Sequence, residues 1–389
     1  MAPRDIGEDH RVSTPLELLF DLCFVVAVSQ AAGQLHVALW ASHYQTAISG
    51  YLAVFFAIWW AWVNFTWFAS AYDVDDLLYR LLTFVQIVGV LILAAGVDSA
   101  FTQGDYATIT VGYLVMRTAL VAQWLRAASG DPDGRPAALR YAAGIAALQV
   151  GWVARLFLPH EAGRIAFYLL AILEMLLPAW AERAGHGRGT PWHAGHIAER
   201  YGLFTLIVLG ECVAAATVAI HTASSSGGVS AGLVAVAAGA VLLVFSIWWW
   251  YFEHPSEEGL RMSRRISFIW GYGHYLVLGS VGALGAGLQL AAASSHGGAA
   301  RASATTAGLA VAVPVAVYLV VTGALQGRLG PQPRGRMGIV CAASALVVLV
   351  GGLAGGLGVS TATLLMGLVV AALVTFDGLR SRRDMSATA

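Results

Sequence analysis

Long apolar runs separated by short polar segments dominate this chain. Twelve runs approach the roughly 20 residues that a helix needs to cross the hydrocarbon core of a bilayer. Because lipid cannot satisfy the open edge of a sheet, each run is predicted to be a helix. The expected fold is an all-α polytopic membrane protein with spans over residues 16–38, 47–69, 78–97, 107–128, 139–158, 165–181, 202–222, 231–252, 266–292, 305–326, 338–357 and 359–377.

Composition supports a membrane protein and excludes other classes. Of the 389 residues, 58% are apolar and only 11% are charged, whereas soluble domains are about 25% charged. High hydrophobicity at zero net charge excludes disorder, and it offers no basic surface for nucleic acid. The three cysteines lie singly in apolar runs, so we expect neither a disulfide framework nor a zinc site.

The loops assign an orientation. With the N-terminus inside, 18 of the 22 arginines fall in inner segments and one in a span, which leaves only Arg155, Arg164 and Arg301 outside. Cytoplasmic loops carry such an excess of basic residues. We therefore expect a multi-pass protein of the inner (plasma) membrane with both termini in the cytoplasm.

The chain also resembles itself. Phe56-Ala-Ile-Trp-Trp-Ala-Trp62 matches Phe245-Ser-Ile-Trp-Trp-Trp-Tyr251, and Tyr113-Leu-Val-Met matches Tyr318-Leu-Val-Val. Six predicted spans separate the copies, so both halves would have the same orientation, as in a parallel 6+6 repeat. The predicted halves are residues 1–185 and 186–389. Chance matching within a restricted apolar alphabet is the alternative.

Ionisable residues inside the predicted spans are the candidate functional groups, because each is costly in lipid. Arg117 lies near the centre of its span and needs an anion, either a substrate or a structural partner. Glu17 and Asp21 are four residues apart and share one helix face. Asp21 is deeper and is the better candidate for binding a proton or ion, whereas Glu17 could be a solvated helix start capped by Thr14.

Two further acids lie mid-span without a local base. Glu211 requires Arg117, a cation or its own proton as a partner, and Glu174 could be a protonated carboxyl bonded to a neighbouring helix. Three deep acids against one arginine favour cation or proton handling over anion transport. Whether Arg117 pairs with Asp21, Glu174 or Glu211 stays open.

Other polar and aromatic groups allow both a structural and a functional interpretation. His193, His196 and Glu199 precede Arg200 in an H-x-x-H-x-x-E spacing that could ligate a metal, although polar residues are ordinary at the mouth of a span. We expect no metal there. Trp59, Trp60 and Trp62 indicate either an interfacial aromatic belt with core packing or an aromatic-lined path for a cation or ligand. The acidic loop 72–80 indicates either helix starts with local ion pairs or a cytoplasmic entrance that attracts cations.

Four segments together resemble the bacterial low temperature requirement protein A family. They are Thr14-Pro-Leu-Glu-Leu-Leu-Phe-Asp21, Tyr113-Leu-Val-Met-Arg117, His196-Ile-Ala-Glu-Arg200 through Glu211, and Trp248-Trp-Trp-Tyr-Phe-Glu253, where the family is expected to carry Asp at the last position. The resemblance implies an integral membrane protein tied to growth at low temperature in some bacteria. The resemblance implies no particular reaction. The candidate functional residues that it implies are Glu17, Asp21, Arg117, His196, Glu199, Arg200 and Glu211.

Two functions are favoured by these features over a third, a membrane enzyme or redox protein that uses haem, quinone or lipid. The first is a proton- or cation-linked secondary transporter whose intramembrane carboxylates bind the ion and whose other partner is a small molecule. The second is a non-transporting membrane factor for cold or envelope stress, with structural buried charges. No nucleophile elbow, phosphate loop or haem-attachment motif is present. We therefore expect neither an enzyme nor a cofactor, and the lipid bilayer as the constant partner.

Overall fold

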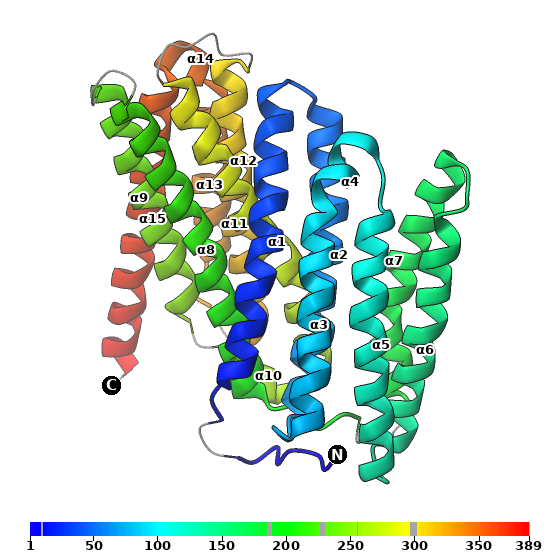
Figure 1. The fold of residues 1–389 in the computed structure, drawn as a ribbon. Coiled ribbons are helices and arrows are strands. Elements are labelled where there is room, and N and C mark those ends of the chain that lie inside the picture. Colours follow the sequence, from blue (N-terminus) through cyan, green and yellow to red (C-terminus); the bar gives the residue numbers. More distant parts are fainter. Residues whose placement is uncertain are drawn as a thin grey trace. The chain divides into compact units, whose positions relative to one another are not determined.

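The computed structural model describes residues 1–8, 11–184, 189–225, 230–254, 256–295, 302–330 and 332–388, so Arg301 lies outside the described residues. Within these ranges the regular structure is helical (Figure 1). The helices are α1 (Pro15–Trp40), α2 (Tyr44–Tyr72), α3 (Leu77–Ala95), α4 (Val97–Gln103), α5 (Ala107–Gly130), α6 (Arg135–Arg155), α7 (His160–Glu182), α8 (Ala194–Ser225), α9 (Ala231–Phe252), α10 (Glu257–Met262), α11 (Arg264–Ser294), α12 (Ala304–Leu329), α13 (Arg336–Gly352), α14 (Ala354–Leu357) and α15 (Val359–Thr388).

Each of the twelve predicted spans lies largely within one long helix, which confirms the all-α polytopic class. Among the described residues, ten helices are both long and apolar enough to cross a membrane. The two long helices outside that set are α5, whose sequence includes Arg117 and Arg126, and α13, which has only 17 residues. The predicted run 338–357 is interrupted at Leu353, where α13 gives way to the single turn of α14.

Short polar residues determine where several helices begin. Asp76 caps α3 by accepting a hydrogen bond from the Tyr79 N–H, and Ser263 caps α11 in the same manner. In the acidic loop, the Arg80 guanidinium lies 2.7 Å from the Asp75 carboxylate. The interpretation of this loop as a helix start with local ion pairs is therefore confirmed.

The helices form two compact units. The first contains Met1–Gln30 and Phe56–Arg200, and the second contains Ala31–Phe55 and Tyr201–Ala389. The chain passes from one unit to the other within α1, within α2 and within α8. The division into halves 1–185 and 186–389 stays a prediction.

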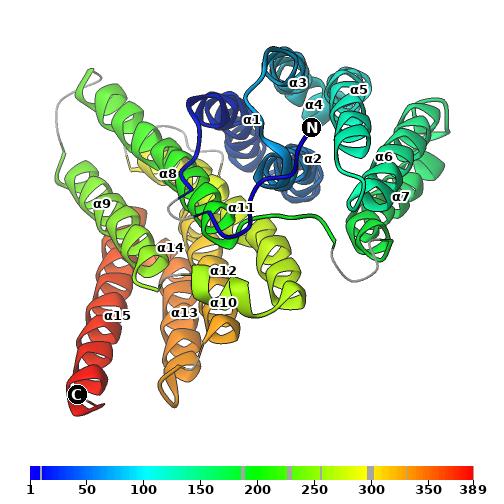
Figure 2. The ribbon, with the colours of Figure 1, turned by 90° about the horizontal axis from the view of Figure 1, so that it is seen from below.

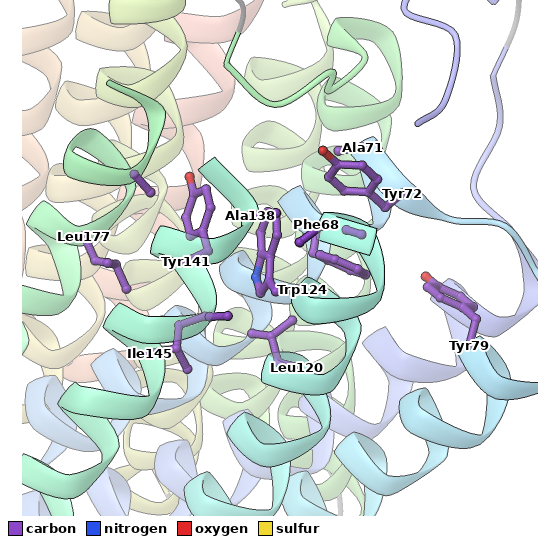
Figure 3. Close-up of a cluster of buried hydrophobic side chains, with 14 residues drawn as sticks. Phe68, Ala71, Tyr72, Tyr79, Leu120, Trp124, Ala138, Tyr141, Ile145 and Leu177 are labelled. Atoms are coloured by element: carbon purple, nitrogen blue, oxygen red, sulfur yellow. The ribbon is translucent and has the colours of Figure 1, made fainter. Parts of the chain in front are cut away.

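In the first unit, α3, α5, α6 and α7 pack in chain order, each against the next (Figure 2). Figure 3 shows the core that α2, α3, α5, α6 and α7 share. Trp124 is its centre, stacked on Tyr141 with ring centroids 4.2 Å apart and edge-on to Phe68 at 4.8 Å. Large aromatic side chains fill the space between helices, so the unit is held by close packing of the kind that drives helix association in lipid.

Glycine allows α3 and α5 to approach closely. A Cβ on Gly89 would lie 2.7 Å from the Gly112 carbonyl oxygen, and one on Gly112 would lie 2.6 Å from the Gly89 carbonyl oxygen. Such backbone contact requires small residues on both helices. The crossing fixes the relative position of the polar side chains that α3 and α5 carry on either side of it.

In the second unit, α12 packs against both α11 and α13, while α15 packs against α9 and α13. Small residues again mark the close crossings: a Cβ on Gly287 would clash with the Ala310 carbonyl oxygen, and one on Gly308 would clash with the Gly351 carbonyl oxygen. The unit is therefore also built around backbone-to-backbone helix contacts.

Candidate functional site

A buried ionic cluster lies where α1 and α8 begin. Thr14 and Glu17 form a capping box at the start of α1: the Thr14 N–H donates to Glu17 Oε2 at 2.8 Å, and the Glu17 N–H donates to Thr14 Oγ1 at 3.3 Å. The predicted cap is therefore confirmed. The alternative of a solvated Glu17 is wrong, because its side chain is 0% exposed.

Arg200 is the cation of this cluster. Its Nη1 lies 2.8 Å from Glu17 Oε1, and its Nη2 donates to Asp21 Oδ1 at 2.5 Å. All three side chains are 0% exposed. Because Glu17 and Asp21 are one helical turn apart, a single guanidinium reaches both. The sequence places Arg200 beside His196 and Glu199 at the mouth of a span, and the structure brings it to the two acids.

The two oxygens of Asp21 have different surroundings. Oδ1 accepts hydrogen bonds from Arg200 and from the indole Nε1 of Trp62 at 2.7 Å. Oδ2 is buried and has no hydrogen-bond partner among the described residues. A buried carboxylate oxygen without a donor is costly as an anion, and protonation removes that cost.

His196 adds an imidazole to the cluster. Its Nε2 lies 3.1 Å from Glu17 Oε1, and its backbone N–H donates to His193 Nδ1 at 3.1 Å. His193 therefore caps the start of α8 with its ring. Glu199, partly buried, accepts from the Ser13 N–H at 3.3 Å. Among the residues that the structure describes, no three His, Cys, Asp or Glu side chains are placed to hold a metal ion.

Charge in the cluster is unbalanced. Among the groups in direct contact, two carboxylates face one guanidinium, so one negative charge remains unless a proton is on Asp21, Glu17 or His196. The buried guanidinium of Arg11 donates to the Ala69 and Ser70 carbonyl oxygens and acts on Glu17 only at longer range. Unbalanced buried charge is unfavourable, and binding of a proton or a cation neutralises it. The site can therefore hold one exchangeable positive charge.

A neighbouring acid outside the spans titrates near neutrality. Asp73 follows α2 and is 2% exposed. Burial, and then the negative charge of Glu17, raise its pKa to about 6. The Arg4 and Arg11 guanidiniums oppose this rise more weakly. Asp73 thus exchanges its proton within electrostatic reach of Glu17.

A second buried ion pair lies in the same unit. Arg117 Nη2 is 3.2 Å from Glu174 Oε2, and both side chains are nearly fully buried. Glu174 also accepts from the indole N–H groups of Trp60 at 2.8 Å and Trp152 at 3.2 Å. Glu174 is therefore the acid that Arg117 contacts. Charge is balanced here, and the tryptophans satisfy the carboxylate.

Glu211 belongs to neither cluster. It lies in the part of α8 assigned to the second unit, is partly buried, and makes no ion pair among the described residues. Its neighbours include Cys212, whose thiol donates to the Val281 carbonyl oxygen at 3.3 Å. The structure thus groups Glu17, Asp21, His196 and Arg200, groups Arg117 with Glu174, and assigns Glu211 to neither.

Sequence reasoning missed a chain of uncharged polar side chains between α3 and α5. Gln86 Nε2 donates to Gln123 Oε1 at 2.8 Å, Gln123 Nε2 donates to Thr83 Oγ1 at 3.4 Å, and Thr83 Oγ1 donates to the Tyr79 carbonyl oxygen at 2.9 Å. All four residues are buried. Their spacing on α3, at positions 79, 83 and 86, is the helical stripe that could have revealed them.

Comparison with known proteins identifies the family. Over 218 residues, 54% of this chain and 51% of the relative, the chain is 30% identical to a protein of Rhizobium meliloti (strain 1021) described as "Uncharacterized protein RA0937". The chain therefore spans about half the length of that relative. The model of the family described as "Bacterial low temperature requirement A protein (LtrA)" matches residues 12–375, which include both buried clusters. The chain belongs to the bacterial low temperature requirement A family, as its motifs indicated.

Proposed function

We propose that this protein is a proton-linked secondary transporter of the inner membrane, with both termini cytoplasmic, and that Glu17, Asp21, His196 and Arg200 form its proton-binding site. The observation that carries the proposal is the bare Oδ2 of Asp21, buried beside a guanidinium that two carboxylates share. Oδ1 already faces two donors, so the proton binds at Oδ2. Before Asp21 is protonated, Arg200 pairs with two anions, Glu17 and Asp21. After Asp21 is protonated, Arg200 pairs with Glu17 alone.

Asp73 supports proton access to the site from one end of the unit. Its proton exchanges near pH 6 and its charge acts on Glu17. Charges facing Glu17 come from α8, as Arg200 and His196, and from the N-terminal segment, as Arg11. A proton arriving through Asp73 therefore reaches two carboxylates whose direct guanidinium partner is Arg200.

The polar chain on α3 and α5 supplies a route from this end into the unit. Tyr79, whose hydroxyl has no partner among the described residues, lies within electrostatic range of Glu17 and Arg200. From Tyr79 to Gln86 the chain rises by about 10 Å. Hydroxyl and amide groups conduct protons only together with water molecules. A small polar pocket can hold one such water molecule.

A pocket beside the Arg117–Glu174 pair lies at the opposite end of the unit. It measures about 30 Å³ and is lined by Tyr113 and Trp152, which contact Arg117 and Glu174, and by Tyr106, Thr110 and Arg155 nearer the start of α5. That volume accommodates a water molecule. Arg117 Nη1 has no hydrogen-bond partner among the described residues and is available to such a water. We assign this pair to gating rather than to proton binding, because its charge is balanced.

A parallel 6+6 repeat is part of the proposal. Two hydrogen bonds support it: the Tyr113 hydroxyl donates to the Ala57 carbonyl oxygen, and the Tyr318 hydroxyl donates to the Ile247 carbonyl oxygen at 2.8 Å. Both tyrosines begin the matched Tyr-Leu-Val segments, and both acceptors lie in the matched Trp-rich segments. The order in which α3, α5, α6 and α7 pack also corresponds to that of α11, α12, α13 and α15.

Two measurements test the proton site. Infrared difference spectra of the purified protein, titrated from pH 4 to 9, should contain a protonated-carboxyl band that Asp21→Asn removes. Protein in liposomes carrying an internal pH dye should move protons, and Asp21→Asn or Glu17→Gln should abolish the movement. Glu257→Gln is the matched control, since Glu257 forms an exposed pair with Arg261 at 2.5 Å. Parent-like flux in both site variants would refute the proposal.

A non-transporting membrane factor for cold or envelope stress is the second candidate. The balanced Arg117–Glu174 pair favours it, because a satisfied buried pair can serve structure alone. This candidate predicts that the carboxyl band is present but that no variant alters flux across the liposome membrane. The two measurements therefore separate a site that holds a proton from a protein that moves one.

A further inference from the structure

A polar-ended pocket in the second unit lies where α12 ends and α13 begins. Its volume is about 380 Å³. Arg328, Gln332 and Arg336 line its polar part, and Ala324, Met337 and Val340 line its apolar part. The proposed proton site uses none of these residues, and the sequence patterns singled out none of them.

Positive charge is in excess around this pocket. Asp377 neutralises Arg336, whose Nε lies 3.0 Å from each carboxylate oxygen, while Gln326 Oε1 accepts from Arg336 Nη2 at 2.9 Å. Arg328 is exposed and has no ion pair among the described residues. Arg380 Nη2 donates to the Arg334 carbonyl oxygen at 2.9 Å, which brings two more guanidinium-bearing residues to the same end of α13.

The start of α13 adds backbone donors. Its N-cap is Gly335, with φ +79°, and no side chain caps the helix. The Arg336 N–H donates to the Pro333 carbonyl oxygen at 3.2 Å, and the first turn carries the positive end of the helix dipole. An anion beside Arg328 therefore meets a guanidinium without an ion pair among the described residues, near the positive end of α13.

The depth of the pocket specifies the rest of the ligand. Arg328 lies in the last turn of α12, a candidate span, and Ala324 lies one turn deeper. Met337 and Val340 extend the apolar lining along α13. A polar end at the mouth of a span, continuous with an apolar part inside the span, matches a charged headgroup joined to acyl chains and not a wholly soluble anion.

We propose that this pocket binds the phosphate headgroup of an anionic glycerophospholipid, with Arg328 as the principal contact and Arg336 held in place by Asp377. A soluble phosphate shares the same charge chemistry. The apolar lining favours the lipid, and the experiment separates the two sources.

The test measures thermal unfolding of the purified full chain in micelles titrated with phosphatidylglycerol, with phosphatidylcholine or with inorganic phosphate. Phosphatidylglycerol should raise the midpoint saturably, whereas phosphatidylcholine and inorganic phosphate at equal concentration should not. Arg328→Gln should weaken the apparent affinity about fivefold, the equivalent of roughly 1 kcal/mol for one basic residue near anionic lipid. Arg265→Gln removes an exposed arginine at the start of α11 and should leave the affinity unchanged.

Equal stabilisation by phosphatidylglycerol and phosphatidylcholine would overturn the proposal, as would an unchanged affinity in Arg328→Gln. Stabilisation by inorganic phosphate alone would assign the pocket to a soluble anion instead. Arg328 is exposed, so its replacement should not prevent folding, and the unliganded midpoint of Arg328→Gln verifies this directly.

Discussion

Arg117 Nη2 lies 3.2 Å from Glu174 Oε2, and the indole N–H groups of Trp60 and Trp152 complete the hydrogen bonding of that carboxylate. The pair joins α5 to α7, and no pattern in the sequence of either helix predicts this contact. Its consequence is that neither charge can be removed alone without leaving the other buried and uncompensated.

Glu174→Gln should therefore destabilise the protein strongly, by about 3–5 kcal/mol, because Arg117 would lose its only acid among the described residues. The free energy of unfolding in micelles, followed by tryptophan fluorescence, measures this. The double replacement Arg117→Gln and Glu174→Gln should lose less than the single one. Glu161→Gln, in an exposed pair with Arg164, is the control and should cost less than about 1 kcal/mol. A loss of similar size in the control would remove burial as the cause.

The Gln86–Gln123 hydrogen bond should separate stability from proton movement. Replacing both residues by Met keeps their approximate shape and removes both polar groups, so stability should be close to that of the parent. Flux into liposomes should fall, because the polar chain from Thr83 is interrupted. Gln86→Met alone leaves the Gln123 amide oxygen without its donor and should be less stable than the double variant. Parent-like flux in a folded double variant would remove this chain from the proton route.

Asp73 should make stability depend on pH. Its pKa is raised from 3.8 to about 6, so the folded state favours the protonated form. Stability from this group is fully present below pH 3.8 and is lost as the pH rises through 6, a cost of about 3 kcal/mol at pH 8. Asp73→Asn should therefore unfold at a higher temperature than the parent at pH 8, and at a similar temperature near pH 4.

Asp76 supplies the opposite case in the same loop. The hydrogen bond from Arg126 lowers the pKa of Asp76, so its contribution to stability is present at neutral pH and is lost on acidification. Asp76→Asn retains an N-cap for α3 and should be less stable than the parent at pH 8. If Asp73→Asn and Asp76→Asn changed stability in the same direction at pH 8, the assignment of Asp73 to a desolvated acid would be wrong.

Gly89→Ala should disrupt the crossing of α3 and α5. The added Cβ would lie 2.5 Å from Met116 Cγ and 2.7 Å from the Gly112 carbonyl oxygen, and the backbone oxygen cannot move aside. Overpacking of this kind costs about 1–3 kcal/mol or more. Gly33→Ala in α1 is the control, since nothing lies within 4 Å of its Cβ, and it should stabilise by up to about 1 kcal/mol. Unfolding midpoints of the two variants should therefore shift in opposite directions.

The identity of the partner of each buried charge was not accessible from the sequence. Hydropathy located Arg117, Glu174 and Asp21 inside spans, because lipid makes any ionisable residue conspicuous there. Periodicity placed Glu17 and Asp21 on one face. Neither pattern reports how helices rotate against each other, so the position of Arg200 at the mouth of a span does not indicate that it reaches Glu17 and Asp21.

The sequence by itself determined the positions of the long helices, the membrane class and the family, because a bilayer forces every long apolar run to satisfy its own backbone hydrogen bonds. Only the tertiary structure decided that Arg200 serves both Glu17 and Asp21, that Arg117 contacts Glu174, and that the tryptophan N–H groups are donors to the acids. These pairings depend on helix rotation and on close glycine crossings such as Gly89 with Gly112. Contacts between residues far apart in the chain set both, and no local pattern encodes them.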